Sequence, residues 1–391
     1  MTTPLPFFQH DLGQAELDAV REVLSGPILT TGATVERLER RLAEYMGARH
    51  LIAVTSCTGA MHLSLAALGV GPGHEVITTP MTFIATSTAI VEAGSTPVFV
   101  DVEEKTGNLD VAKVEAAITE RTRAIIPVHL YGQMCDMRAL RAIADKHRLH
   151  IVEDAAHCIE GERDGIRPGQ LSDTACLSFY ATKNLTCGEG GAIVCNDTAL
   201  AERLRLLRLH GMTKTAYDRS REGYQHWDMV TFGWKYNMDN IHAALLLPQL
   251  DRLDVTWRKR EELAHRYRSL LAEVPGLTWP QTLPGVKHAH HLFPVWIVNG
   301  RRDEVVAGLQ QRGIPTVVNY RAIHLLTYFR ERFGFRVGTF PVAERIGDMT
   351  LSLPFYPGIP NDHVTVVAEA LRTCQETMPA GHGCGTTGHH E

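Results

Sequence analysis

The alternation of apolar and polar positions along this chain predicts helices first and then strands and helices in turn. Residues 14–25 and 35–46 carry apolar side chains at helical spacing with charged residues opposite, which is typical of amphipathic helices. From residue 51, short apolar runs alternate with helical patterns. The predicted strands are residues 51–56, 75–79, 96–102, 124–130, 150–154, 175–180 and 192–195, and the predicted helices between them are 60–68, 83–93, 110–118, 136–147 and 198–208.

This alternation favours an α/β fold in which helices cover both faces of a mostly parallel sheet. Seven predicted strands fall within residues 51–195, so we expect them to form one large domain. In such sheets the ligand lies beyond the carboxyl ends of the strands. The residues that follow each strand are therefore the first candidates for a functional site.

The pattern changes in the second part of the chain. Two helices, one reaching residue 253 and one over 255–273, lead into shorter elements that predict a small α+β domain. We expect a large domain over residues 1–250, a small domain over 251–378 and a disordered Gly- and His-rich tail over 379–391. The elements predicted for the small domain are strands at 291–298 and 314–319 and helices at 302–312 and 361–374.

Composition narrows the function classes. The 391 residues are 44% hydrophobic and 21% charged, as in ordinary globular proteins. A formal charge of −5 and the lack of a Lys/Arg run argue against a nucleic-acid partner. No apolar run reaches the ~18 residues of a membrane span, and residues 1–9 lack a signal-peptide pattern, so we expect no membrane partner and a cytoplasmic location. The eight cysteines form no CxxC pair, which predicts reduced thiols and no metal site.

One lysine stands out. Lys183 follows the predicted strand 175–180 and is the only charged residue between Asp173 and Glu189. Burial in apolar surroundings lowers the pKa of an ammonium group and frees the amine to form a Schiff base. The alternative is a lysine that extends along the surface to reach solvent.

The ends of other strands add complementary chemistry. Ser56, Cys57 and Thr58 end one strand and open a helix, where backbone N–H groups can bind phosphate or simply form a helix cap. Asp154 ends a buried strand, and a carboxylate there needs a cationic or protonated partner. A lysine, an aspartate and a phosphate cradle along one edge are what a protein contributes to pyridoxal 5'-phosphate chemistry.

Across residues 5–375 the chain resembles the DegT-type (DegT/StrS) nucleotide-sugar aminotransferases, a family of fold type I pyridoxal phosphate enzymes. The stretch 178–191, which contains Lys183, is the most diagnostic part. The resemblance implies the fold type I architecture, a seven-stranded mostly parallel sheet with a small α+β C-terminal domain. The other matching stretches are residues 56–63, 67–77, 81–83, 153–157 and 353–358.

The resemblance also implies roles for individual residues. Lys183 would carry the cofactor as a Schiff base and move the catalytic proton, and Asp154 would keep the pyridine nitrogen protonated. Phe83 would stack on the cofactor ring, and His157 would lie by its phenolic oxygen or on its opposite face. The residues implied to contact the phosphate are Ser56, Cys57, Thr58 and Ser178.

The chain departs from the usual family pattern in three places. Ser56-Cys57-Thr58 replaces Asn-Gly-Thr, and His157 stands where Gln is frequent. Residues 233–238 replace an Asn-Tyr-Arg-Met pattern in a loop that reaches the cofactor phosphate of the partner subunit, and both Lys235 and Asn237 are candidates for that contact. This version of the loop is most similar to enzymes that aminate C4 of a UDP-linked 4-keto sugar.

The predicted function is transfer of an amino group from L-glutamate to the keto group of a nucleotide-linked sugar, in a homodimer with shared active sites. Arg321 could bind a carboxylate or a sugar diphosphate with two parallel hydrogen bonds, or lie in solvent. The candidate substrate-binding residues are Thr31, Tyr180, Arg321 and His324. Alternative acceptors are a keto-inositol or another cyclic ketone. A sugar dehydratase or a regulatory protein of the same fold is a further alternative, although Lys183 and Asp154 are both present.

Overall fold

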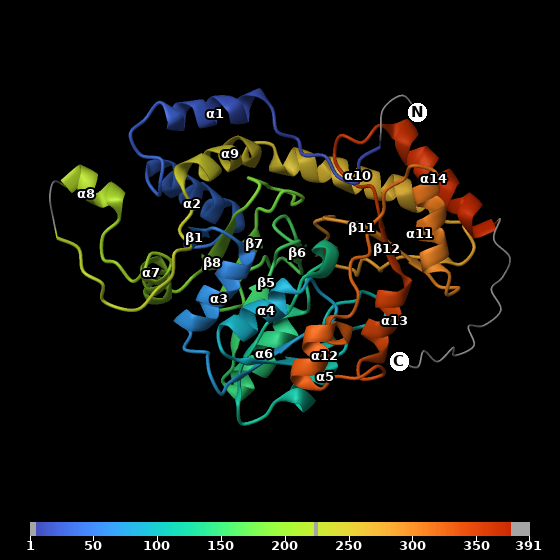
Figure 1. Ribbon diagram of the computed structural model, residues 1–391, viewed down its shortest axis with the longest axis horizontal. Coiled ribbons are helices and arrows are strands. Elements are labelled where there is room, and N and C mark those ends of the chain that lie inside the picture. Colours follow the sequence, from blue (N-terminus) through green and yellow to red (C-terminus); the bar gives the residue numbers. More distant parts are fainter. Residues whose placement is uncertain (1–4, 223–225, 377–391) are drawn as a thin grey trace.

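A computed structural model describes residues 5–222 and 226–376 (Figure 1). Its centre is one seven-stranded sheet with the strand order β1-β8-β7-β5-β4-β2-β3. Only β8 runs antiparallel to its neighbours, so the predicted mostly parallel sheet is confirmed. The strands are β1 (His50–Val54), β2 (Glu75–Thr78), β3 (Thr96–Phe99), β4 (Thr122–Ile125), β5 (His150–Asp154), β7 (Thr174–Ser178) and β8 (Gly191–Cys195).

Alternate residues of each strand serve two different cores, because successive side chains of a strand point to opposite faces. Leu51 and Ile151 pack into a core with α2, α6 and α9, whereas their neighbours Ile52 and Val152 pack with α3, α4 and α7. The sheet is therefore buried on both faces, as the apolar runs predicted. The covering helices are α2 (Ala33–Met46), α3 (Cys57–Ala67), α4 (Ala85–Glu92), α6 (Met137–His147), α7 (Thr198–Leu207) and α9 (Asn240–Leu250).

Several of these helices begin at an aspartate that caps them. The side chains of Asp136, Asp197 and Asp239 each accept a hydrogen bond from the backbone N–H three residues later. Such a cap satisfies an N–H group that has no acceptor inside the helix. These short local signals explain why α6 and α7 start within one residue of the predicted positions, 136 and 198.

A separate hydrophobic core lies in the C-terminal part of the chain, beside the large sheet (Figure 1). It packs a three-stranded antiparallel sheet, ordered β12-β11-β9, against three helices. Leu5 also belongs to this core, although the sequence assigned residues 1–250 to the large domain. The elements are α10 (Leu253–Leu271), β9 (Leu277–Thr278), β11 (Phe293–Ile297), α11 (Arg302–Gln311), β12 (Thr350–Leu353) and α14 (Asn361–Glu376).

One prediction in this part of the chain is wrong. Residues 314–319 do not form a strand, and only an isolated bridge joins Val317 to Ser352. β11 pairs with β12, a strand that the sequence pattern did not predict. Two helices between residues 327 and 349 were also not predicted. They are α12 (Thr327–Phe333) and α13 (Pro341–Met349).

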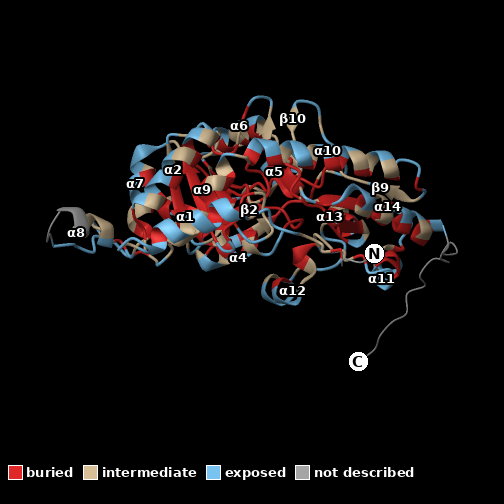
Figure 2. Ribbon diagram, turned by 90° about the horizontal axis from the view of Figure 1, so that it is seen from above, coloured by how far each residue is buried: buried red, intermediate tan, exposed pale blue. Residues whose placement is uncertain are grey.

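The remaining elements lie around these cores. Helix α1 packs along α9 on the outside of the sheet, with most of its side chains exposed (Figures 1 and 2). No helix among the described residues is long and apolar enough to cross a membrane. The expected disordered tail, 379–391, lies outside the described residues. The remaining elements are α1 (Gln14–Leu24), α5 (Val111–Val114), β6 (Glu162–Arg163), α8 (Ala216–Glu222), β10 (Val286–Lys287) and the 3-10 turns Glu115–Ala117, Leu130–Gly132 and Ile323–Leu325.

Candidate active site

A cleft of about 570 Å³ opens at the carboxyl ends of β1, β2, β5 and β7. Segments from the C-terminal part, around residues 291 and 320, form its other side. This is the edge at which the α/β pattern predicted a ligand. The predicted site residues that line it are Ser56, Cys57, Thr58, Phe83, Asp154, His157, Ser178, Tyr180 and Lys183.

Lys183 enters this cleft from the turn that follows β7, where its backbone N–H donates to the Tyr180 carbonyl (2.9 Å). Burial lowers the pKa of Lys183 from 10.5 to about 8, and the negative charge of Asp154 opposes this change. Desolvation therefore outweighs the attraction of the carboxylate. The result is an amine that is much easier to deprotonate than an exposed lysine.

Asp154 is held in place by two hydrogen bonds. The Thr86 hydroxyl donates to its Oδ2 (2.7 Å) and the Ala156 N–H donates to its Oδ1 (3.2 Å). The side chain lies at the end of β5 and is almost fully buried. Asp154 is thus fixed at the cleft wall with its carboxylate oriented by a threonine that the sequence had not singled out.

His157 lies between two other side chains of the cleft. Its Nε2 is 3.3 Å from the Tyr320 hydroxyl, and its ring stacks on His291 with 4.3 Å between the ring centroids. Burial and the nearby Lys183 hold the pKa of His157 well below its usual range, so the ring is neutral. Its buried Nδ1 has no hydrogen-bond partner among the described residues. A buried polar atom without a partner is unusual in proteins, and in a cleft it indicates a ligand contact.

The N-terminus of α3 forms a cradle at the same edge. Ser56 caps the helix, and its hydroxyl accepts the Gly59 N–H (3.0 Å). The N–H groups of Cys57 and Thr58 belong to the first turn, where a helix offers no acceptor of its own and its dipole favours an anion. These features suit a phosphate group.

Gly191 makes this cradle possible. A Cβ atom at this position of β8 would lie 2.4 Å from the carbonyl carbon of Ser56 and 2.6 Å from the backbone nitrogen of Cys57. Both are backbone atoms, so no side chain could move aside. The strand can run this close to the helix start only because residue 191 is glycine.

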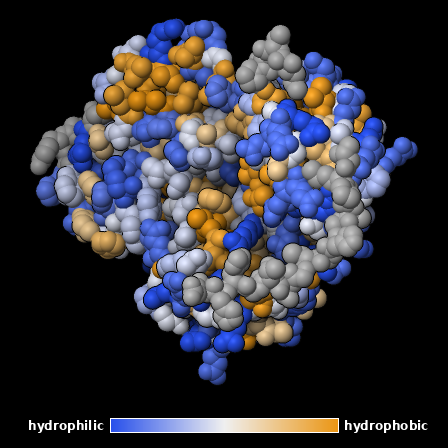
Figure 3. Space-filling model, turned by 45° about the vertical axis from the view of Figure 1, so that its right-hand side comes forward, coloured by the Kyte–Doolittle hydropathy of each residue, from blue (hydrophilic) through white to orange (hydrophobic). Residues whose placement is uncertain are grey.

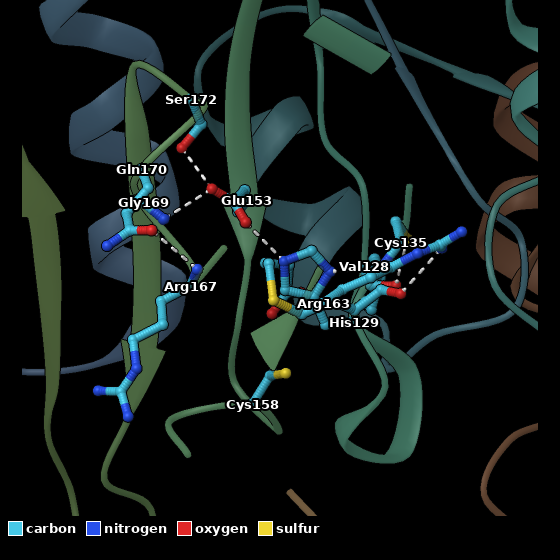
Figure 4. A network of polar contacts seen from close by, with 12 residues as sticks. Val128, His129, Cys135, Glu153, Cys158, Arg163, Arg167, Gly169, Gln170 and Ser172 are labelled. Carbon is cyan, nitrogen blue, oxygen red and sulfur yellow. Dashed lines mark hydrogen bonds and ion pairs between the residues drawn. The ribbon is translucent and has the colours of Figure 1, made fainter. Parts of the chain in front are cut away.

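A buried network of hydrogen bonds holds Glu153, the residue before Asp154 on β5 (Figure 4). The Glu153 carboxylate accepts from His129 Nε2–H (2.6 Å), from the Gly169 N–H (2.7 Å) and from the Ser172 hydroxyl (2.5 Å). The Cys135 N–H donates to His129 Nδ1 (3.2 Å), so the histidine carries its proton on Nε2 and is neutral. This network ties the strand end that presents Asp154 to two neighbouring loops.

The sequence did not identify three residues that the fold brings to this site: Thr86, His291 and Tyr320. Thr86 lies on a helix and carries no charge, so nothing in the local pattern distinguishes it. Tyr320 lies beside Arg321, whose charge drew the prediction to itself. The histidine-rich stretch 288–291, at the start of a predicted strand, is the signal that could have identified His291.

Three predicted substrate residues lie outside the lining of the cleft: Thr31, Arg321 and His324. Arg321 is exposed. His324 is fully buried, with its Nε2 2.9 Å from Oε1 of Glu344 and its ring against Phe340. This environment leaves the imidazole of His324 no open path to a ligand in the cleft.

Thr31, Lys235 and Asn237 form a cluster of their own. The Asn237 amide donates to the Thr31 hydroxyl (2.7 Å), and Lys235 Nζ donates to Asn237 Oδ1 (2.5 Å). Thr31 and Asn237 line a second hollow of about 860 Å³ beside α2 and α7, not the cleft that contains Lys183. Within one chain, these three residues are not brought to the cleft.

A sheet edge that joins a buried lysine, an oriented aspartate and an anion-binding helix start fits the chemistry of pyridoxal phosphate. Residues 10–372 match the DegT/DnrJ/EryC1/StrS aminotransferase family. The chain therefore belongs to this family, is a transaminase and uses pyridoxal phosphate as its cofactor.

Individual relatives are similar to this chain over nearly its whole length. The spore coat polysaccharide biosynthesis protein SpsC of Bacillus subtilis is 41% identical over 94% of this chain and 96% of its own length. The crystal structure of DesV from S. venezuelae has a TM-score of 0.89 and 39% identity, covering 96% of this chain and 99% of DesV. Spr1654 from Streptococcus pneumoniae, in its PLP form, has a TM-score of 0.89 and 30% identity, with 96% and 99% coverage.

Proposed function

We propose that this aminotransferase moves an amino group from L-glutamate to the keto group of a nucleotide-linked sugar, giving an amino sugar nucleotide. The most specific form of the proposal is an acceptor keto group at C4 of a UDP-linked sugar. The observation that carries the reaction is the buried Lys183, which shares one cleft with Asp154 and the start of α3. A sugar acceptor is supported by the relative SpsC, whose name assigns it to polysaccharide biosynthesis.

The residues of the cleft fit pyridoxal phosphate. The N–H groups of Cys57 and Thr58 and the hydroxyl of Ser178 would hold the phosphate. Asp154 would pair with the protonated pyridine nitrogen, and the unpartnered Nδ1 of His157 offers a contact for the phenolic oxygen. Phe83, more than half exposed, presents an aromatic ring to the cleft. The bound cofactor supplies a ring that accepts electrons from the reacting carbon.

The protein side of the reaction then depends on proton transfer at Lys183. Its Nζ would take a proton from the donor carbon in one half-reaction and deliver one to the acceptor carbon in the other. A pKa near 8 suits this role, because the amine can both lose and regain a proton near neutral pH. The buried ring of His157 and the partly buried ring of Tyr320 would together exclude water from the same wall.

We further propose a homodimer in the cytoplasm whose active sites are shared. Lys235 or Asn237 would reach the partner's cofactor phosphate, which would explain why neither residue lines the cleft of its own chain. Thr31 and the exposed Arg321 would contact the acceptor substrate from the two subunits, and Tyr180 would contact it at the mouth of the cleft. His324 remains a prediction, and its buried pairing with Glu344 gives it little support.

The deciding experiment combines the cofactor spectrum with an acceptor panel. We expect the purified protein to lose its visible absorbance band when L-glutamate is added and to regain it with a UDP-linked 4-keto sugar. NMR of the product would give the position of the new amino group. Lys183→Ala should lack the band, and Asp154→Asn should bind cofactor but turn over at least about a hundredfold more slowly. An unchanged spectrum in Lys183→Ala would contradict the role of Lys183. If the band returned only with keto-inositols, the acceptor would be a keto-inositol and not a nucleotide-linked sugar.

A further inference from the structure

The cleft contains a second buried histidine, His291, which the proposed reaction does not use. Its ring lies 4.3 Å from that of His157, with 28° between the two planes, and only 6% of the residue is exposed. It comes from the segment just before β11, more than a hundred residues from His157 in sequence. The two rings therefore form one wall of the cleft from two distant parts of the chain.

Asn184, the residue after Lys183, determines how His291 is held. Its Nδ2 donates to the Glu160 carboxylate (2.9 Å) and to the Ala289 carbonyl (2.9 Å). Both partners are acceptors, so the amide can have only this orientation, and its Oδ1 is left to accept a hydrogen bond. That bond comes from His291 Nδ1, at 3.4 Å. His291 consequently carries its proton on Nδ1.

Both rings of the stack are neutral, so they add no positive charge beside Lys183. Burial, Lys183 and the neighbouring His157 hold the pKa of His291 well below its usual range. A neutral ring beside a neutral ring can exclude water without repelling the ammonium form of Lys183. Burial is also the main reason why the pKa of Lys183 itself is low.

We propose that His291 is a positioning residue of the active site: anchored by Asn184, its ring packs behind His157 and keeps His157 and Lys183 out of water. This proposal deepens the function above and rests on Lys183 carrying the cofactor. It assigns no proton transfer to His291. It also gives a role to Asn184, which ties the residue after the lysine to the segment that leads into β11.

Several charged or titratable groups surround this wall. Asp154, at the end of β5, and Cys57, at the start of α3, act on Lys183. Tyr320 contacts His157, and burial raises the pKa of its hydroxyl, so it stays protonated. The remaining pair, Glu160 and Arg260, lies behind Asn184. Burial raises the pKa of Glu160 and lowers that of Arg260.

The test is a pH titration of the visible absorbance band of the holoenzyme, without substrate. The chromophore includes Lys183 Nζ, so its apparent pKa reports water around that nitrogen. His291→Ala should raise this pKa by roughly one unit, because water entering beside the lysine stabilises the charged form. Asn184→Ala should raise it in the same direction. His291→Phe, which keeps a flat ring in the stack, should stay within about a third of a unit of the wild type.

A matched control comes from the same segment. His288 stacks on His290 at 4.4 Å, but neither lines the cleft, so His288→Ala should leave the titration unchanged. An unchanged titration in both His291→Ala and Asn184→Ala would overturn the proposal. It would also be overturned if His291→Phe shifted the pKa as much as His291→Ala. A wild type without the visible band would instead refute the role of Lys183, so the two failures are distinguishable.

Discussion

At the scale of single residues, the chemistry of this protein depends on how burial changes Lys183 and its neighbours. The apolar surroundings that lower the lysine pKa to about 8 also keep His157 neutral. Asp154 stays oriented because Thr86 and the Ala156 N–H occupy its two oxygens. The buried lysine is costly for folding, because the unfolded chain would carry it fully charged in water.

This cost predicts a pH-dependent effect of removing Lys183. Between pH about 8 and 10.5 the unfolded chain binds more protons than the folded cofactor-free chain, so stability rises with pH over this window. Lys183→Met should therefore raise the melting temperature of the cofactor-free protein at neutral pH. Its advantage should shrink as the pH passes from 8 to 10.5. Thermal denaturation at both ends of the window checks this, and an advantage independent of pH would contradict it.

At the scale of elements, the site depends on a close approach between a strand and a helix end. β8 passes directly against the start of α3, and this start would hold the cofactor phosphate. On β5, which is separated from β8 by β7, the Glu153 network fixes the end that carries Asp154 (Figure 4). The start of α3 would hold the cofactor phosphate, and its position is fixed by the contact with β8. The end of β5 would hold the pyridine nitrogen, and its position is fixed by the Glu153 network.

Gly191→Ala tests this arrangement. The added methyl group would meet backbone atoms of Ser56 and Cys57 and push the start of α3 out of place. We expect the dissociation constant for pyridoxal phosphate to rise roughly tenfold or more, since each hydrogen bond to a charged group is worth about 1.5–3 kcal/mol. Titration of the cofactor into the cofactor-free variant measures this.

Gly13→Ala is the matched control, because nothing lies within 4 Å of a Cβ atom at that position. It should bind the cofactor like the wild type. Equal affinity of Gly191→Ala and the wild type would show that the phosphate is held elsewhere.

At the scale of the whole molecule, the distribution of apolar side chains over one face bears on the proposed homodimer. Apolar side chains gather there in patches (Figure 3). Large apolar residues also remain exposed in the stretch that precedes Lys235: Trp227, Met229, Val230 and Phe232. Exposed apolar groups of this kind are typical of protein interfaces. They support the proposed homodimer, in which the loop with Lys235 and Asn237 would complete the partner's site.

Shared sites predict complementation between inactive variants. Lys183→Ala and a Lys235→Ala/Asn237→Ala double variant should each have little activity alone. Mixed under conditions that exchange subunits, they should regain activity, because one site of each hybrid dimer then carries only wild-type residues. Native mass spectrometry would confirm the hybrids. Hybrids without regained activity would show that each chain forms a complete site by itself.

The sequence by itself determined the α/β class, the seven strands and the residues at the strand ends. These features are local: an apolar run long enough for a buried strand, a capping aspartate, and a lysine in an apolar stretch each predict their own surroundings. Ser56, Asp154 and Lys183 follow different strands, and they lie at one edge of the sheet because parallel strands place their carboxyl ends together.

Only the tertiary structure decided which distant groups join or leave that edge. His291 and Tyr320 reach the cleft because the C-terminal part packs against the strand ends, and no local pattern reports such a contact. His324 does not reach the cleft, because it is buried and paired with Glu344, twenty residues away in sequence. Residues 314–319 had the composition of a strand, but they meet the sheet only at one bridge, between Val317 and Ser352 of β12. Pairing and burial between distant segments depend on the whole packed core, which short stretches of sequence do not encode.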